Sequence, residues 1–474
     1  MKVLAIDQGT TSTRALLYDG GALRPVMQRA HRQILPAPGH VEHDPAELLA
    51  NVNAALTTPC DLVALANQGE SCLAWDGRDG RPITPVIVWQ DARTAPETAR
   101  LEQDGMADEV TSRAGLPPDP YFSASKLGWI MRHCPDAAPL ARAGHLRMGT
   151  TDAFFRDRLT GRFETDIATA SRTSLMNIRT GQWDDTLCRI FGVPPASLPR
   201  ITPTAGRFGV TAQGARLVVS ITDQQAALYG HGCRRPGDAK ATFGTGAFVQ
   251  CLTGTLIRPD QPGPLPTIAW HLPGEPVRYA LDGAVYTAAA AVDWAKSLGL
   301  FSDFHAIGRF SGAAAIDRGL AFLPALAGLA CPHWQRGARG AWFGLGLEHG
   351  PADLMQALLE GIALRTAEAL LAIHTCQPVT GLSIDGGLAR NDYLTDFLAG
   401  LLPCPVARAD AIESTALGLA HMALTAEGRP VPDTPAHRPV TPATKARAMA
   451  KTRLNRFARI RTQLSALSAE IAAC

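Results

Sequence analysis

The sequence lacks several signatures that would assign a protein class at once. Its ten cysteines are scattered from Cys60 to Cys474 without a CxxC pair, which argues against a disulfide framework and a structural zinc site. A net charge of only +2 favours neither nucleic acid nor a membrane surface as a partner. The first residues, MKVLAID, are too short in apolar length for a secretory signal, and no later run approaches a membrane span. These absences predict a cytoplasmic protein without membrane insertion.

Two common nucleotide-binding motifs are also missing. The chain has no GxxxxGK[ST] sequence, which excludes a P-loop enzyme, and no GxGxxG opening a helix after a strand, which disfavours a Rossmann dinucleotide site. The composition is otherwise ordinary for a globular protein, with 46% hydrophobic and 19% charged residues. At 474 residues the chain is too long for one compact core. Length therefore predicts two to three domains.

Short apolar runs that end in polar or glycine-rich turns recur along the chain. In the first half, residues 3–6 precede Asp7 and residues 62–66 precede Asn67-Gln68-Gly69-Glu70. A second series begins with residues 218–221 and includes residues 382–384. Predicted helices alternate with these strands, which is typical of an α/β fold. We place one domain boundary near residue 220, giving domains 1–220 and 221–474.

Helix signals at three places complete this outline. Asp44 followed by Pro45 predicts the N-cap and first position of a helix over residues 45–56. Residues 413–424 also indicate a helix. Near the C-terminus, Leu454, Phe457, Ile460, Leu464 and Leu467 recur at helical spacing in a basic segment. This pattern predicts a helix that docks by one apolar face and leaves its basic face in solvent.

Three of the turns carry residues suited to phosphate chemistry. They are DQGTTSTR at residues 7–14, GTG at residues 244–246, and DGG at residues 385–387 with Asn391 following. A carboxylate at a strand tip can hold a divalent cation, and Gly-Thr turns offer hydroxyls and backbone N–H groups to phosphate. Each turn alone is usually only a turn. Three of them spread over both halves of the chain are a more specific signal.

With these turns in this order, the chain resembles the FGGY carbohydrate kinases of the actin and sugar-kinase superfamily. The resemblance covers nearly the whole chain. Besides the three turns, it rests on GHVEHDP at residues 39–45, DPYFSASKLGWI at 119–130, DQQAAL at 223–228, FGTGAF at 243–248, LPALAGLACPHW at 323–334, GAWFGL at 340–345 and DGGLARN at 385–391.

The resemblance implies two ribonuclease-H-like (actin-like ATPase) domains flanking a catalytic cleft. Residues 1–220 would bind the acceptor and carry the first phosphate motif, and residues 221–474 would carry the general base and bind the nucleotide. The implied activity is ATP-dependent phosphorylation of a small polyol, with glycerol as the best single substrate. Phosphoryl transfer asks mainly for positioning and charge neutralisation, so one base, Mg²⁺ and phosphate-binding turns suffice. Homo-oligomers are common in the family.

The same resemblance assigns roles to individual residues. Asp223 would be the general base, although a carboxylate at a helix N-terminus can also simply be stabilised by the helix dipole. Asp7 would orient Mg²⁺. The acceptor would be bound by Glu70, Trp89, Tyr121, Asp223, Gln224 and Phe248, and the nucleotide by Thr10, Thr11, Ser12, Arg14, Gly244, Thr245, Gly387 and Asn391.

This acceptor set makes chemical sense for a polyol. Carboxylates and an amide pair with hydroxyl groups, and aromatic rings cover the C–H edge of the ligand. Taken singly, however, Trp89 and Phe248 would be core aromatics.

One departure from the family concerns the acceptor. The glycerol-phosphorylating members carry an arginine between the glutamine and glutamate of the strand-tip motif, where this chain has Gly69. A substrate hydroxyl left without its partner costs about 1–3 kcal/mol. Either a water or another side chain fills the gap and glycerol remains the substrate, or the vacated volume admits a longer polyol or a sugar. A non-catalytic, ligand-binding relative is disfavoured by the retained Asp7, Asp223 and GTG turn.

Two further departures concern the nucleotide and regulation. Ala289 and Asp293 stand where the family has a glycine and a glutamine near the base, so nucleotide preference is left open. Residues 206–220 are short and offer Arg216 as the main cation toward the end of the segment. An inhibitory sugar bisphosphate needs clustered donors and positive charge. We therefore predict no such regulation through this segment.

Overall fold

The computed structural model describes residues 1–260, 262–409, 413–433, 437–442 and 444–473. The chain forms two compact units, of which the first comprises Met1–Gly232, Pro266–Tyr279 and Glu413–Thr434, and the second comprises Cys233–Leu265, Ala280–Ile412 and Pro435–Cys474. The sequence predicts two continuous domains that meet at residue 220, whereas each of these units is built from three separate segments of the chain. Two segments distant in sequence return to the first unit: one contains a helix that packs on its central sheet, and the other hydrogen-bonds to Ser171 and Thr204.

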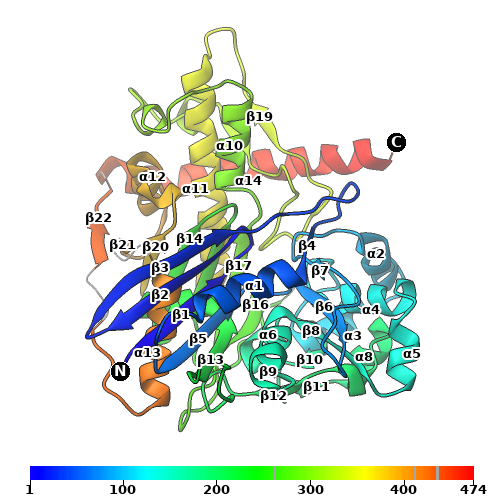
Figure 1. Cartoon of the computed structure of the whole chain (residues 1–474). Coiled ribbons are helices and arrows are strands. Elements are labelled where there is room, and N and C mark those ends of the chain that lie inside the picture. Colours follow the sequence, from blue (N-terminus) through cyan, green and yellow to red (C-terminus); the bar gives the residue numbers. More distant parts are fainter. Residues whose placement is uncertain (261, 410–412, 434–436, 443, 474) are drawn as a thin grey trace. The chain divides into compact units, whose positions relative to one another are not determined.

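A five-stranded sheet forms the centre of the first unit, in the order β13-β5-β1-β2-β3. Its strands are β1 (Val3–Gln8), β2 (Ser12–Asp19), β3 (Ala22–Ala30), β5 (Leu62–Asn67) and β13 (Arg216–Thr222) (Figure 1). β1, β2 and β3 form an antiparallel meander, while β5 is parallel to both β1 and β13. The continuous burial of β5 explains its apolar run, because parallel strands are covered on both faces.

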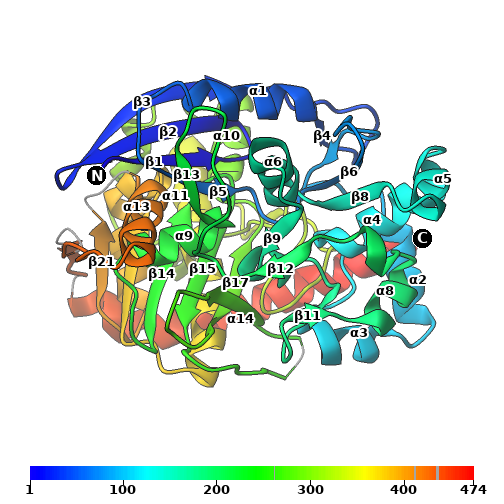
Figure 2. The same ribbon diagram turned by 60° about the horizontal axis from the view of Figure 1, so that its bottom comes forward.

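Helices cover both faces of this sheet. α1 (Pro45–Ala55) lies on one face, and α9 (Asp223–Gly230) and α13 (Ser414–Ala426) lie on the other (Figure 2). On the α1 side, Leu48 and Val52 pack with alternate residues of the strands, which include Leu4, Ile6, Val63, Leu65 and Leu217. The predicted cap of α1 is confirmed, since the Asp44 side chain accepts a hydrogen bond from Ala46 N at 2.8 Å.

α9 and α13 pack closely against each other at a glycine in each helix. A Cβ added at Gly418 would lie 1.9 Å from the carbonyl oxygen of Ala226, and one at Gly230 would lie 1.8 Å from that of Ser414. Because both obstacles are backbone atoms, the helices would have to separate. We expect Gly418→Ala to lower the unfolding free energy by about 3 kcal/mol, measured as a loss of several degrees in Tm. Gly381→Ala is the control, because nothing lies within 4 Å of its added Cβ.

The rest of the first unit consists of shorter elements. A four-stranded sheet has the order β4-β7-β6-β8. The elements are β4 (Glu42–His43), β6 (Cys72–Asp76), β7 (Val86–Ile87), α2 (Ala95–Gln103), α3 (Ala107–Ala114), α4 (Ser123–His133), α5 (Ala137–Arg142), β8 (Leu146–Thr150), α6 (Thr151–Thr160), β9 (Glu164–Asp166), α7 (Ile167–Ala170), β10 (Met176–Asn177), β11 (Gln182–Trp183), α8 (Asp185–Phe191), β12 (Arg200–Thr202) and β16 (Leu265–Trp270).

The second unit also has a central sheet, which includes the strand order β17-β15-β14-β20-β21-β22. The 26-residue helix α11 (Pro351–Cys376) is the main helix of its core and packs with residues of β14 and β15. The elements of this unit are β14 (Asp238–Phe243), β15 (Ala247–Leu252), β17 (Arg278–Val285), α10 (Ala289–Ser297), β18 (Ala321–Leu323), β19 (Ala341–Phe343), β20 (Gly381–Asp385), α12 (Asp392–Leu401), β21 (Val406–Ala409), β22 (His437–Val440) and α14 (Thr444–Ala473).

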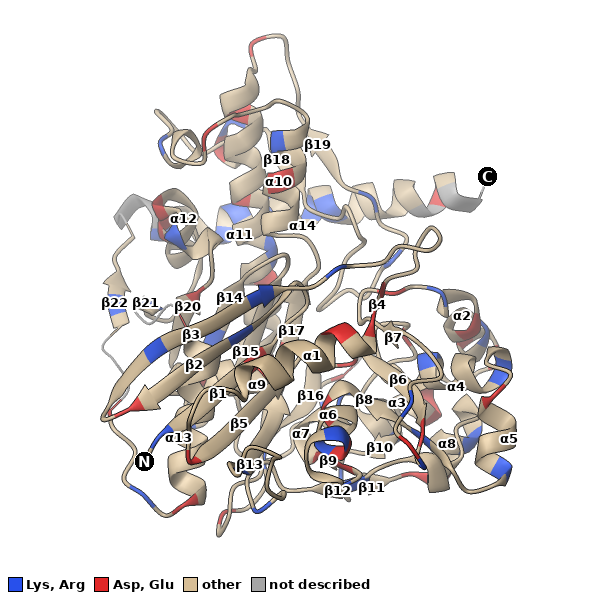
Figure 3. Cartoon of the chain, viewed as in Figure 1, with Lys and Arg blue, Asp and Glu red and all other residues tan. Residues whose placement is uncertain are grey.

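The C-terminal helix α14 docks by its apolar face, as its sequence predicts, but its basic residues are not all left in solvent. Arg453 pairs with Asp317 at 2.6 Å and Arg461 with Glu368 at 3.1 Å, with the arginine side chains only 10% and 13% exposed. Phe457 is fully buried and Ile460 is 8% exposed, whereas Leu467, nearer the end, is 50% exposed. Lys and Arg residues are interspersed with Asp and Glu through both units (Figure 3). Among the helices of the described residues, none is long and apolar enough to cross a membrane.

Candidate active site

Three parallel strands of the first unit end at one edge of the sheet. Gln8 of β1 lies opposite Asn67 of β5, and Asn67 lies opposite Thr222 of β13. The same edge of the sheet therefore carries three segments, which are the turn of residues 9–11, the turn of residues 68–70 and the start of α9. Carboxyl ends of parallel strands are where ligands bind in α/β folds. This register brings the Asp7, Glu70 and Asp223 segments together.

Asp7 is a buried carboxyl group surrounded by charges. Its pKa is raised to about 7, first by burial, then by the nearby Asp223 and to a smaller extent by Glu413, while Arg14 acts in the opposite direction. Its Oδ1 atom is buried and has no hydrogen-bond partner among the described residues. Arg14 Nη1 lies 3.5 Å from Glu413 Oε1. The Oδ1 atom of Asp7 is therefore available to accept a hydrogen bond from a ligand or to coordinate a cation.

The predicted acceptor residues Trp89 and Tyr121 contact each other, with ring centroids 5.6 Å apart at 73°. Trp89 Nε1 donates a hydrogen bond to Thr10 Oγ1 at 3.0 Å, and its backbone N donates to Ser71 Oγ at 3.1 Å. Trp89 thus links the first phosphate turn, through its ring, to Ser71 next to Glu70, through its backbone. The residue is half-buried, so it is not simply an aromatic residue of the core.

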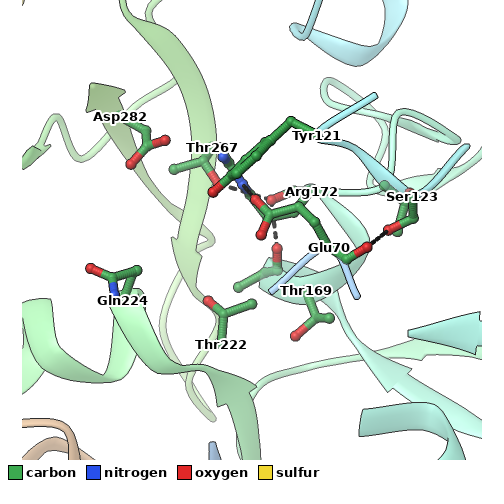
Figure 4. Close-up of polar contacts among 12 residues, drawn as sticks. Glu70, Tyr121, Ser123, Thr169, Arg172, Thr222, Gln224, Thr267 and Asp282 are labelled. Atoms are coloured by element: carbon green, nitrogen blue, oxygen red, sulfur yellow. Dashed lines mark hydrogen bonds and ion pairs between the residues drawn. The ribbon is translucent and has the colours of Figure 1, made fainter. Parts of the chain in front are cut away.

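Glu70 lies at the centre of a tight turn and pairs with a residue that the sequence did not single out. Arg172, just after α7, donates from Nε to Glu70 Oε1 at 2.6 Å (Figure 4). The pair spans 102 positions in the chain, and no periodicity or motif signals such a long-range contact. Beside Glu70, a Cβ added at Gly69 would meet Thr222 Cγ2 at 3.5 Å, which is an ordinary van der Waals contact, so this position tolerates a Cβ.

Asp223 is the first residue of α9, and Gln224 follows it. The backbone N of Gln224 donates to Asp223 Oδ1 at 2.7 Å, and both side chains are half-buried. Both residues extend from the start of the helix, at the edge where β13 ends (Figure 4, where Gln224 is labelled). Asp223 is held at the N-terminus of α9, and its side chain is only half-buried.

In the second unit, two parallel strands bring two predicted turns together. Thr242 of β14 lies opposite Asp385 of β20. Gly386, with φ +95°, packs so closely that an added Cβ would lie 2.3 Å from Phe243 O, so the DGG turn needs glycine at this position. The GTG turn is fixed to the start of α10, because Ala288 N donates to Thr245 O at 2.8 Å and Ala289 N donates to Gly244 O at 3.0 Å.

A pocket of about 410 Å³ opens beside these turns within the second unit. Its lining includes two residues assigned to the nucleotide, Gly387 and Asn391, and the two departures from the family, Ala289 and Asp293, together with Val292, Phe304, His305, Ile307, Leu388 and Arg390. Asn391 Nδ2 donates to Ile307 O at 3.0 Å and its Oδ1 accepts from Leu394 N at 2.9 Å. Asn391 is therefore held rigidly at the pocket wall.

The predicted site residues thus fall into two groups. The first unit holds Asp7, Thr10, Thr11, Ser12, Arg14, Glu70, Trp89, Tyr121, Asp223 and Gln224, and the second holds Gly244, Thr245, Phe248, Gly387 and Asn391. Phe248 lies on β15 and is half-buried.

Solved structures identify the architecture. Glycerol kinase from Plasmodium falciparum, in complex with ADP, is similar with a TM-score of 0.86 and 26% identity, over 97% of this chain and 98% of that chain. Gluconate kinase from Lactobacillus acidophilus is similar in fold, with a TM-score of 0.89 and 20% identity over 99% of each chain. The chain therefore has the two-domain actin-like ATPase fold, which confirms the predicted α/β fold class.

Sequence relatives give the family. Residues 2–224 match the N-terminal domain, and residues 239–427 the C-terminal domain, of the FGGY family of carbohydrate kinases. Glycerol kinase of Trichlorobacter lovleyi is 41% identical over 447 residues, covering 90% of each chain. Glycerol kinase of Nocardia farcinica is 38% identical over 449 residues, with the same coverage. The chain belongs to the FGGY family of carbohydrate kinases, enzymes that transfer a phosphoryl group to an alcohol, as the motifs predict.

Proposed function

We propose that this kinase transfers the γ-phosphoryl group of ATP to a small polyol, with glycerol as the substrate and glycerol 3-phosphate as the product. The observation that carries the proposal is the common sheet edge at which the Asp7, Glu70 and Asp223 segments meet. The relatives at 38–41% identity are named glycerol kinases, which supports the choice of acceptor.

Asp223 acts as the general base in this proposal. The acceptor hydroxyl attacks the γ-phosphorus, its proton passes to the Asp223 carboxylate, and ADP leaves. Glu70 and Gln224 pair with the acceptor hydroxyls, and Trp89, Tyr121 and Phe248 cover its carbon chain. Arg14 and the hydroxyls of Thr10, Thr11 and Ser12 bind the phosphates from one turn, and Gly244 and Thr245 bind them from another. Such positioning is most of what phosphoryl transfer requires from a protein.

The Asp7 carboxylate fits a Mg²⁺ ion. Its buried Oδ1 has no hydrogen-bond partner among the described residues, and a hard oxygen ligand of this kind suits the ion. Within the described part of the chain, no three His, Cys, Asp or Glu side chains converge as a metal cage. This agrees with the preference of Mg²⁺ for one or two carboxylates, with water and phosphate completing its shell. When bound, the ion would neutralise charge on the phosphates.

The pocket of about 410 Å³ in the second unit is assigned to the nucleoside of ATP. Its apolar lining suits a base, and Gly387 and Asn391 lie in the turn that the family uses there. The ADP in the Plasmodium falciparum glycerol kinase structure supports an adenine nucleotide. Asp293 adds a carboxylate to the same wall, and we propose that this carboxylate influences which base the pocket prefers.

An ADP-release assay with Mg-ATP tests the proposal against glycerol, erythritol, threitol, the pentitols and common ketoses. We expect glycerol to be the best acceptor, with a KM in the micromolar to millimolar range common among enzymes. Strong turnover of a longer acceptor with poor turnover of glycerol would overturn the choice of substrate while keeping the kinase. No turnover of any acceptor would support a non-catalytic relative.

A second candidate is a kinase for a longer polyol or sugar, because glycine at position 69 occupies less volume than the family's arginine. An added Cβ meets only Thr222 side-chain atoms, at 3.5 and 3.9 Å, so the first side-chain atom of Gly69→Arg makes ordinary van der Waals contacts. We expect this variant to lower kcat/KM for tetritols and pentitols at least about tenfold, because the guanidinium fills the volume that a longer chain needs. Equal loss for glycerol and for the longer acceptors would contradict a role of position 69 in selecting chain length.

A further inference from the structure

The ion pair between Glu70 and Arg172 is almost completely buried. The two atoms Arg172 Nε and Glu70 Oε1 are 2.6 Å apart, and the side chains are 5% and 6% exposed. Removing one member of such a pair leaves a buried charge without compensation. The guanidinium therefore controls both the charge and the direction of the Glu70 carboxylate.

The backbone on the glutamate side is held in an unusual conformation. Glu70 has φ +60°, and Ser71 N donates to Gly69 O at 2.7 Å across it, which makes a three-residue turn of the strained kind. Ser123 Oγ donates to Glu70 O at 2.9 Å and fixes the turn from α4. Strain of this kind persists only where the surroundings overdetermine it, and it clusters at functional sites.

The guanidinium also reaches the aromatic residues of the site. Its carbon lies 5.9 Å from the centroid of Tyr121 and 5.5 Å from that of Phe122; Figure 4 shows Arg172 beside Tyr121. Both distances are within the range of a cation–π attraction. Tyr121 in turn contacts Trp89. Arg172 thus contacts both parts of the proposed acceptor site. These are the Glu70 carboxylate, which is assigned to the acceptor hydroxyls, and the aromatic rings, which are assigned to the carbon chain of the acceptor.

We propose that Arg172 is a positioning residue of the acceptor site that acts through Glu70. Its Nε–H, hydrogen-bonded to Oε1, fixes the direction in which the strained turn presents the Glu70 carboxylate. This inference rests on the proposed role of Glu70 in binding the acceptor.

The first test compares Arg172→Gln with Arg172→Lys and with a matched control. Arg172→Gln should raise the KM for glycerol at least about tenfold, since a hydrogen bond to a charged group is lost. The KM for ATP should stay within about threefold, because the nucleotide is assigned elsewhere. Lysine keeps the charge without the planar fork, so we expect Arg172→Lys to give an intermediate KM for glycerol.

The control is Arg156→Gln. Arg156 Nη2 pairs with Glu164 Oε2 at 2.6 Å with exposures of 0% and 6%, and its guanidinium lies 4.0 Å from the ring centroid of Phe208. The pair has the same chemistry as Glu70–Arg172, but it joins α6 and β9, which carry none of the proposed acceptor residues. Arg156→Gln should lower Tm and leave the KM for glycerol within about twofold. An equal rise of that KM in both variants would make Arg172 merely structural.

Activity of the unsubstituted kinase toward glycerol is measured first, so that failure of this inference is distinguishable from failure of the proposed function. If Arg172→Gln does not fold, Arg172→Lys compared with Arg156→Lys gives the same contrast: a rise in the KM for glycerol in Arg172→Lys alone supports the inference, and an equal rise in both variants overturns it.

Discussion

Asp223→Asn is expected to lower kcat for the best acceptor by about 10³-fold, within the range of general-base catalysis. Asparagine keeps the shape of the side chain and an oxygen at the start of α9, but it cannot take the proton of the attacking hydroxyl. Acceptor affinity, measured by calorimetry with the variant, should stay within about threefold. The measurement of kcat is a coupled ADP-release assay at saturating Mg-ATP.

The alternative role of Asp223, a carboxylate that only stabilises the helix N-terminus, has its own control. Asp185 is the first residue of α8, as Asp223 is of α9. An exposed charge at such a position contributes about 0.3–1 kcal/mol to stability. Asp185→Asn should therefore cause a small loss of Tm and no change in kcat. If Asp223→Asn behaves in the same way, Asp223 is not the base.

The sequence predicts the strand ends better than it predicts the domains. Parallel strands covered on both faces leave continuous apolar runs, so β5 and β13 are visible as segments, and their polar turns mark the edge at which we propose that ligands bind. The return of residues 266–279 and 413–434 to the first unit has no local signal. Periodicity shows that residues 413–424 are helical, but it does not show that α13 packs on β1 and α9.

The same limit applies within the site. Asp7, Glu70 and Asp223 could be singled out as candidates because each lies at or soon after the end of a buried strand, in a motif of its own. Arg172 could not, because it follows a four-residue helix and its partner is far away in sequence. The pocket beside Gly387 could be predicted from the DGG turn, whereas its volume depends on Phe304, His305 and Ile307, which no motif marked. Motifs therefore locate the candidate groups, and tertiary packing decides what surrounds them.

Asp7→Asn has the second of the two largest expected effects, a fall in kcat of about 10²–10³-fold, as for the loss of a preorganised electrostatic group. Asparagine at this position would keep the size of the side chain but would remove the negative charge that would hold Mg²⁺ beside the phosphates. We expect the Mg²⁺ concentration for half-maximal activity to rise as well. Unchanged Mg²⁺ dependence would remove Asp7 from the role of metal ligand.

Stability gives a readout of Asp7 that is independent of activity. The folded carboxyl holds its proton up to about pH 7, whereas the unfolded one releases it near its ordinary pKa of 3.8. Between these values the folded state binds more protons, so the unfolding free energy falls as pH rises. Without divalent cations, Asp7→Asn should match the unsubstituted protein near pH 4 and exceed its Tm at pH 8. Mg²⁺ at pH 8 should raise the Tm of the unsubstituted protein only, because the ion stabilises the ionised carboxylate that burial disfavours.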